Sequence, residues 1–182
     1  MNDLKRRTID AIIETEGGFT DNPADSGGAT MYGITEVEAR AAGWHGPMRD
    51  LPRPLAFHIY AARYWDSLRL DDVAALSPRI AAELADTGVN MGTATAARFL
   101  QRSLNALNKG GSLFPDLATD GVIGQGTVTA LAAFLRVRAV EGETVMLRAI
   151  NGLQAARYIG LAEQRAKDEE FVFGWLLNRV VI

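Results

Sequence analysis

The feature that most constrains the fold is a double glycine, Gly17-Gly18, which ends a helical pattern near the N-terminus. Apolar residues recur at helical spacing through residues 4–15 and predict a first helix. Glycine takes the left-handed conformation that closes a helix without a steric penalty, so the helix is expected to stop directly after Glu16. A polar loop with a second pair, Gly27-Gly28, comes next, and residues 29–34 are predicted to form a short strand. The helix therefore ends in a carboxylate beside a polar, turn-rich loop, which is typical of a functional site.

The rest of the chain is predicted to be mainly helical. Two helix starts carry clear local signals. Thr35 and Glu38 fit a capping box, and Ser77-Pro78 places a capping residue before a proline at the first helical position. Helices are expected from Thr35 to near Gly43, from Pro54 to about Trp65, from Pro78 toward Gly92, from Thr93 to Gly110, and over about 127–140, 144–166 and 169–179. The fold class is therefore mainly α with a small β-hairpin patch, and the loop at 110–126 is the one candidate boundary within it.

Composition limits the classes of function. The chain has 182 residues, a net charge of −3 and no cysteine, so disulfides and thiolate-metal sites are excluded and nucleic acid is not an expected partner. The charged N-terminus is not followed by an apolar core, and no stretch approaches the length of a membrane span. We therefore expect a protein that is made in the cytoplasm without a standard signal peptide, does not insert stably into a membrane, and is a monomer.

The residues around Glu16 suit glycoside hydrolysis. That reaction needs a carboxylic acid that is protonated near neutral pH and donates its proton to the leaving oxygen. Apolar neighbours raise the pKa of a glutamate, and a pocket between the Ile12/Ile13 face and Phe19 would supply them. The reaction also needs a group that activates water or stabilises the cationic sugar. Asp25 is the candidate for that role, and the hydroxyl of Thr30 is a candidate to hold the same water.

Each of these residues also has a plain structural interpretation. Glu16 at a helix end is often only a solvated acid, Asp25 can stabilise a turn through its own backbone, and Thr30 can serve only as a strand residue. No metal or cofactor site is expected, because the Asp21–Asp25 segment fails the calcium-loop pattern and the two histidines are far from metal-ligand spacing.

Substrate contacts have candidates as well. Tyr32, Tyr64 and Trp65 could stack on sugar faces, although aromatic residues in a helical protein more often belong to the core. Asn90 lies four residues after Asp86 on one predicted helix face. This pair could bind the acetamido groups of a sugar or could fasten two helices together.

Several stretches of the chain carry a resemblance to a known family: Glu16–Phe19, Asn22–Gly28, Thr30–Thr35, Ile59-Tyr60 with Tyr64–Asp66, Asp86–Gly92, Leu100–Asn105, Asp120–Thr127 and Phe173–Trp175. In these stretches the chain resembles glycoside hydrolase family 108, whose members are N-acetylmuramidases, many of them from phages and prophages. From about residue 95 the chain is similar to the companion peptidoglycan-binding segment of this family.

The resemblance implies a lysozyme-like fold and cleavage of the bond between N-acetylmuramic acid and N-acetylglucosamine in bacterial peptidoglycan. By position, Glu16 would be the general acid and Asp25 the second carboxylate. Thr30 follows Asp25 one residue sooner than the related lysozymes imply, so Thr35 is a rival for the role of the threonine. The resemblance also implies a catalytic portion over residues 1–94 and a peptidoglycan-binding portion over 95–182, packed into one compact unit.

An endolysin-like, bacteriolytic enzyme of this kind would act in the periplasm or at the cell wall. Three alternatives stay open at this point, and the weakest is a structural or secretion-assisting protein with a vestigial site, because the Glu16 loop is intact. A lytic transglycosylase also uses one glutamate, but the muramic 6-hydroxyl attacks instead of water. A non-catalytic module that only binds cell wall would need no more than the helical second half of the chain.

Overall fold

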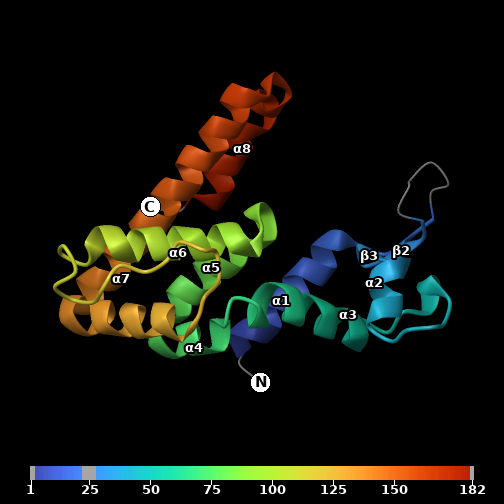
Figure 1. Cartoon of the computed structure of the whole chain (residues 1–182). Coiled ribbons are helices and arrows are strands. Elements are labelled where there is room, and N and C mark those ends of the chain that lie inside the picture. The colour runs from blue at the N-terminus through green and yellow to red at the C-terminus, as the bar shows by residue number, and fades with distance from the viewer. Residues whose placement is uncertain (1–2, 22–27, 181–182) are drawn as a thin grey trace. The chain divides into compact units, whose positions relative to one another are not determined.

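The computed structural model describes residues 3–21 and 28–180 and forms two compact units, residues 1–66 and 67–182 (Figure 1). Both units are built mainly of helices, and the small sheet found among the described residues lies in the first. The predicted fold class, mainly α with a small β patch, is confirmed. The functional division at residue 94 stays a prediction, and the loop at 110–126 lies inside the second unit.

In residues 3–21 and 28–66, the first unit contains three α-helices, a three-stranded antiparallel sheet and two other helical segments. In chain order these are α1 (Asp3–Glu16), β1 (Phe19–Thr20), β2 (Thr30–Met31), β3 (Ile34–Thr35), α2 (Glu36–Ala41), the 3-10 helix η1 (Met48–Asp50), α3 (Arg53–Tyr60) and the π-helix η2 (Ala61–Asp66). Helix α1 packs against α3 and η2, and Ile9, Ile34 and Trp65 are fully buried in this core.

The sheet differs from the prediction in one respect. Residues 29–34 do not form one strand, because Tyr32 and Gly33 reverse the chain with φ angles of +54° and +71°. Two successive positive φ angles make a type I′ turn, whose twist suits a two-residue hairpin. The hairpin pairs Met31 with Ile34 and Thr30 with Thr35, and β1 pairs with β2 on its other side.

The capping box at the start of α2 is confirmed. The Thr35 hydroxyl oxygen accepts a hydrogen bond from the Glu38 amide at 3.3 Å, and the Glu38 carboxylate accepts from the Thr35 amide at 2.9 Å. This reciprocal pair satisfies two backbone donors at the helix start. It also fixes the position of Glu38 relative to β3.

In the residues described, all regular structure of the second unit is helical. It contains α4 (Leu70–Leu76), α5 (Pro78–Met91), α6 (Thr93–Leu107), α7 (Gln125–Gln164), the 3-10 helix η3 (Ala166–Asp168) and α8 (Glu169–Arg179). Helix α5 begins as predicted, with the Ser77 hydroxyl accepting from the Ile80 amide at 3.1 Å. The core lies where α5, α6 and α7 pack together, and Leu84, Leu100 and Phe134 are among its buried side chains.

The two helices predicted at 127–140 and 144–166 are joined as α7, with one break at Ala139. Ala139 has a non-helical backbone (φ +48°, ψ −138°), so the break lies just before the predicted gap. Gly142 is crowded on the far side of this kink, because a Cβ there would lie 2.5 Å from the Arg138 Cβ. Gly142 therefore permits the close approach, while Ala139 takes the unusual backbone.

The loop between α6 and α7 is held by amide side chains of α6. Both polar atoms of the Asn105 amide bind the backbone of Leu117, each at 2.8 Å, and Gln101 binds Asp120, Gly121 and Val122. Because both atoms of the Asn105 amide are engaged, its side chain is fixed in place.

No helix in the described ranges combines the length and the apolar character that a membrane crossing requires.

Candidate active site

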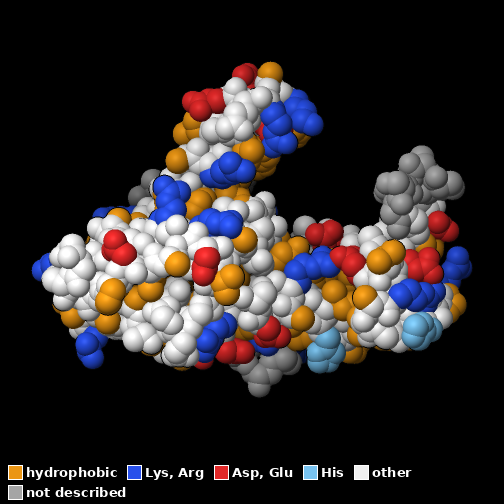
Figure 2. All heavy atoms as spheres, viewed as in Figure 1, with side chains coloured by type: hydrophobic (Ala, Val, Ile, Leu, Met, Phe, Trp, Pro, Cys, Tyr) orange, Lys and Arg blue, Asp and Glu red, His pale blue; other side chains and the backbone are white. Residues whose placement is uncertain are grey.

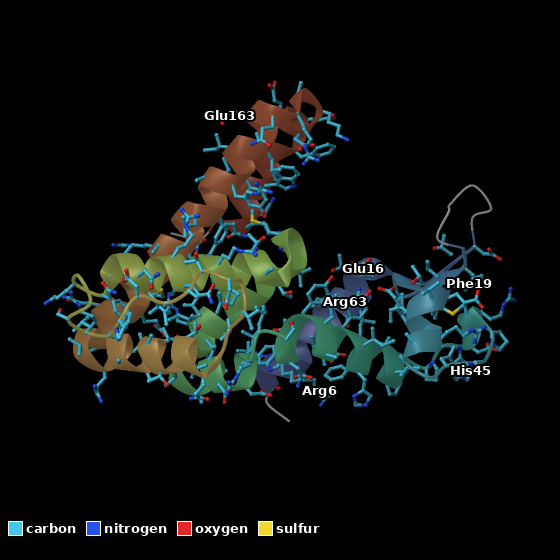
Figure 3. The ribbon with its side chains drawn as sticks, viewed as in Figure 1. Arg6, Glu16, Phe19, His45, Arg63 and Glu163 are labelled. Atoms are coloured by element: carbon cyan, nitrogen blue, oxygen red, sulfur yellow. The ribbon has the colours of Figure 1, made fainter. Side chains whose placement is uncertain are left out.

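Glu16 is the last residue of α1, and its side chain is exposed to solvent. Ile12 and Ile13, which were expected to form an apolar pocket for it, are buried in the core. The carboxyl group instead lies against the turn of the hairpin. Glu16 is labelled in Figure 3 together with Arg63 of η2, which belongs to the same unit.

The side chains of Glu16 and Tyr60 both lie close to Gly33. A Cβ built on Gly33 would lie 2.5 Å from the Glu16 Oε2, 3.0 Å from the Glu16 Cβ and 3.0 Å from the Tyr60 hydroxyl. Any side chain at this position would therefore push the carboxyl group away, and the φ of +71° also favours glycine. The space that a side chain would fill at Gly33 is occupied by the Glu16 carboxylate.

Tyr60 fixes the turn from the inside. Its side chain is 2% exposed, and its hydroxyl donates a 2.7 Å hydrogen bond to the Tyr32 carbonyl. Burial, and then the negative charge of Glu16, raises the pKa of Tyr60 to about 12. The hydroxyl is therefore a donor throughout the pH range in which a protein works. Tyr32, which has the left-handed backbone, is held through its carbonyl by this bond.

Arg63 and Glu38 form an ion pair beside Tyr60 and Tyr64. The Arg63 guanidinium lies 5.8 Å from the ring centroids of both Tyr60 and Tyr64, and the two rings are stacked with centroids 6.0 Å apart. Burial alone would raise the pKa of Glu38, but hydrogen bonds from Thr35 and Arg63 outweigh it and hold that pKa below its usual range. Glu38 is therefore an ionised, structural carboxylate.

The threonines proposed for catalysis lie side by side in the sheet. Thr30 of β2 is half-buried and is paired across the sheet with Thr20 and with Thr35. The Thr35 hydroxyl donates a 3.0 Å hydrogen bond to Glu38 in addition to capping α2, so it already serves the fold. Asp25, the predicted second carboxylate, lies outside the described residues.

The predicted sugar-binding residues have different environments. Tyr32 and Tyr64 are half-buried, so part of each ring is accessible. Trp65 is fully buried, and its ring offers no face to a sugar in this structure because η2 turns it into the core. Asn90 belongs to the second unit, where its exposed amide donates to the Asp86 carbonyl at 2.8 Å. Asp86 is paired with Arg179 of α8 at 2.7 Å, so it fastens α5 to α8.

Gly33 and Tyr60, which lie against Glu16, were not predicted as site residues, and neither was Arg63, which lies over Tyr60 and Tyr64. A glycine directly after a tyrosine in a β-prone run was the available signal for the turn. Nothing in the spacing of residues 16, 33 and 60 indicates that they meet, because they come from three separate elements. Among the described residues there is no group of three or more side chains placed to hold a metal ion.

Comparisons with known proteins identify the family of the chain and its fold. Residues 9–92 match the family model described as glycosyl hydrolase 108, and residues 95–180 match the model described as a predicted peptidoglycan domain. No curated protein matches the chain. Among solved structures, that of Brucella abortus SagA is similar with a TM-score of 0.56 at 21% sequence identity, covering 97% of this chain and 98% of that one. At this identity the likeness is one of fold, and it agrees with the lysozyme-like helical fold that was predicted.

Proposed function

This chain belongs to the glycosyl hydrolase 108 family, and on that premise we propose that it is an N-acetylmuramidase. It cleaves the bond between N-acetylmuramic acid and N-acetylglucosamine in bacterial peptidoglycan. The two family matches support a glycosidase that acts on peptidoglycan. The finer assignment to this bond is the proposal.

The observation that carries the proposal is the position of Glu16 against Gly33 and Tyr60. A glutamate at a helix end, exposed to solvent and fixed on one side by a tight turn, is open to a polymeric substrate. A glycan strand lying over it would displace water, and loss of solvation favours the protonated carboxyl group. Glu16 then donates its proton to the glycosidic oxygen as the bond to the muramic C1 breaks.

The second half of the reaction needs a water molecule that attacks the muramic C1. In our proposal Asp25 accepts a proton from that water and Thr30 holds the water through its hydroxyl. Because the Thr35 hydroxyl is committed to Glu38, Thr30 is the better candidate of the two threonines. The accessible parts of Tyr32 and Tyr64 are proposed to contact the sugar rings. The substrate lies outside the cytoplasmic membrane, so the proposal also entails action in the periplasm or at the cell wall.

The test is digestion of purified peptidoglycan by the wild-type protein and by Glu16→Gln, with mass analysis of the fragments. Wild type is expected to release fragments with reducing muramic acid ends. Glu16→Gln is expected to be slower by about 10²- to 10⁴-fold, the usual contribution of a general acid. Glu14→Gln, an exposed glutamate two residues earlier in the same helix, is the matched control and should keep full activity.

The alternatives predict different products. Anhydromuramic ends would identify a lytic transglycosylase. Retained binding to sacculi without any fragments would identify a wall-binding module. Full activity in Glu16→Gln would remove Glu16 from the mechanism, provided that circular dichroism shows the same helical content in both proteins.

A further inference from the structure

A groove in the second unit carries polar groups that the proposed reaction does not use. It lies between α6 and the part of α7 after the kink and has a volume of about 450 Å³, within the range of small-ligand sites. Its lining residues come from two stretches of these helices: Arg102, Ser103, Asn105, Ala106, Ala149 and Leu153. Both helices lie within residues 95–180, the segment that matches the predicted peptidoglycan domain.

The apolar part of the groove is lined mainly by small side chains. Ala106 comes from α6, while Ala149 and Leu153 lie four residues apart on one face of α7. The two alanines leave room for groups of methyl size. No aromatic residue lines the groove, so it lacks the flat surfaces on which sugar rings commonly stack.

Ser103 gives the groove a buried hydroxyl without a partner. The residue is 3% exposed, and among the described residues its Oγ has no hydrogen-bond partner. A buried polar group without a hydrogen-bond partner destabilises the protein. A bound peptide group that reaches this hydroxyl would offset part of this destabilisation.

Arg102 supplies a free positive charge at the edge of the groove. Its side chain is exposed, and it makes no ion pair or hydrogen bond with any residue that the structure describes. A guanidinium in this state can bind a carboxylate through two parallel hydrogen bonds. Asn105, by contrast, has both amide atoms engaged by Leu117 and therefore acts as a fixed wall. Figure 2 shows basic and acidic side chains interspersed over the visible face of each unit.

We infer that this groove binds the peptide stem of peptidoglycan rather than its glycan strand. The stem presents alanine methyl groups, backbone amides and free carboxylates. These groups match in turn the alanine-lined floor, the Ser103 hydroxyl and the Arg102 guanidinium. The inference rests on the proposed function only in taking peptidoglycan as the partner. It assigns recognition of the peptide to the second unit, apart from Glu16 in the first.

The test is isothermal titration of the full chain with a free stem tetrapeptide, L-Ala-γ-D-Glu-diaminopimelate-D-Ala, and with chitotetraose as the sugar probe. We expect the wild type to bind the tetrapeptide through the groove. Arg102→Gln is expected to bind it at least tenfold more weakly, which corresponds to the loss of about 1.4 kcal/mol. Ala106→Leu, at an exposed position where folding is not at risk, should also weaken binding because it fills the groove.

Arg136→Gln is the matched control, since Arg136 is an exposed arginine of α7 that does not line the groove. The inference is overturned if the wild type does not bind the tetrapeptide, or if Arg102→Gln binds it as tightly as Arg136→Gln does. Cleavage of peptide-free glycan strands is measured in parallel and should be the same in Arg102→Gln and wild type. If the wild type binds the tetrapeptide but does not cleave glycan strands, the proposed function is wrong and the groove assignment stands.

Discussion

Replacing Gly33 with alanine tests whether the hairpin turn positions the Glu16 carboxyl group. The new Cβ would lie 2.5 Å from the Glu16 Oε2 and 3.0 Å from both the Glu16 Cβ and the Tyr60 hydroxyl. The carboxyl oxygen is at the end of a flexible side chain and can rotate away. The other two contacts are less easily relieved, so the carboxyl group must leave its present position.

Two separate costs follow from this substitution. Alanine with a left-handed backbone costs about 1–2 kcal/mol of folding stability relative to glycine. Displacement of the carboxyl group by about 1 Å is expected to cost about 10²-fold in the rate of glycan cleavage. Most of the loss of activity therefore comes from geometry and not from unfolding.

Gly43→Ala separates these two costs. Gly43 lies in the same unit with a similar φ of +87°, but a Cβ there meets nothing within 4 Å. Both variants are expected to lower the melting temperature, Gly33→Ala at least as much as Gly43→Ala, and only Gly33→Ala should lose about 10²-fold in activity. The measurements are thermal unfolding and the initial rate of release of reducing ends from peptidoglycan.

The reasoning would be refuted if both alanine variants kept wild-type activity, measured well below their melting temperatures. That result would mean that the contact between Gly33 and Glu16 has no part in catalysis. An equal loss of activity in both variants would attribute the effect to backbone strain alone.

Two further predictions concern titratable groups in the two units. Tyr60→Phe keeps the ring and removes the hydrogen bond to Tyr32, so it should lower stability near neutral pH by about 1 kcal/mol in thermal unfolding. The folded-state pKa of Tyr60 is about 12 instead of 10.0, so its contribution to folding stability is complete below pH 10 and is lost as the pH rises toward 12. Wild type should therefore lose stability over this pH range, and Tyr60→Phe should not show this loss. Burial of Glu83, and to a smaller extent the charge of Asp86, raises the pKa of Glu83. The contribution of Glu83 to folding stability is therefore complete below the ordinary glutamate pKa and is lost as the pH rises through the raised pKa. Glu83→Gln should therefore melt higher than wild type at pH 7, with a gap that closes toward pH 4; a constant gap would contradict the assignment of this pH dependence to Glu83.

The helix boundaries were the part of the fold most readable from sequence. The capping box of Thr35 and Glu38 and the Ser77-Pro78 start depend on residues within one turn, so the signal is local and the structure confirms it. The strand at 29–34 was predicted without its turn. Tyrosine rarely has a positive φ. Tyr32 has one here, and its carbonyl accepts a hydrogen bond from Tyr60 of a helix that is distant in the sequence.

The candidate site could be predicted only in part. Glu16 follows from a helix end beside glycines, which is again a local pattern. The contact with Gly33 and Tyr60 depends on the packing of α1 and α3 around the hairpin, and no local pattern encodes that packing. Trp65 illustrates the same limit in the other direction. An aromatic residue beside Tyr64 suggests a sugar platform, but the π-helical segment directs its ring inward.

The two-residue turn at Tyr32-Gly33 also restricts how this segment can change in length. Side chains alternate between the two faces of a strand, so insertion or deletion of one residue in β3 would exchange its faces. Ile34 would then leave the core, and Thr35 would lose both its pairing with Thr30 and its position as the cap of α2. Single-residue insertions and deletions between Thr30 and Glu38 should therefore be tolerated poorly.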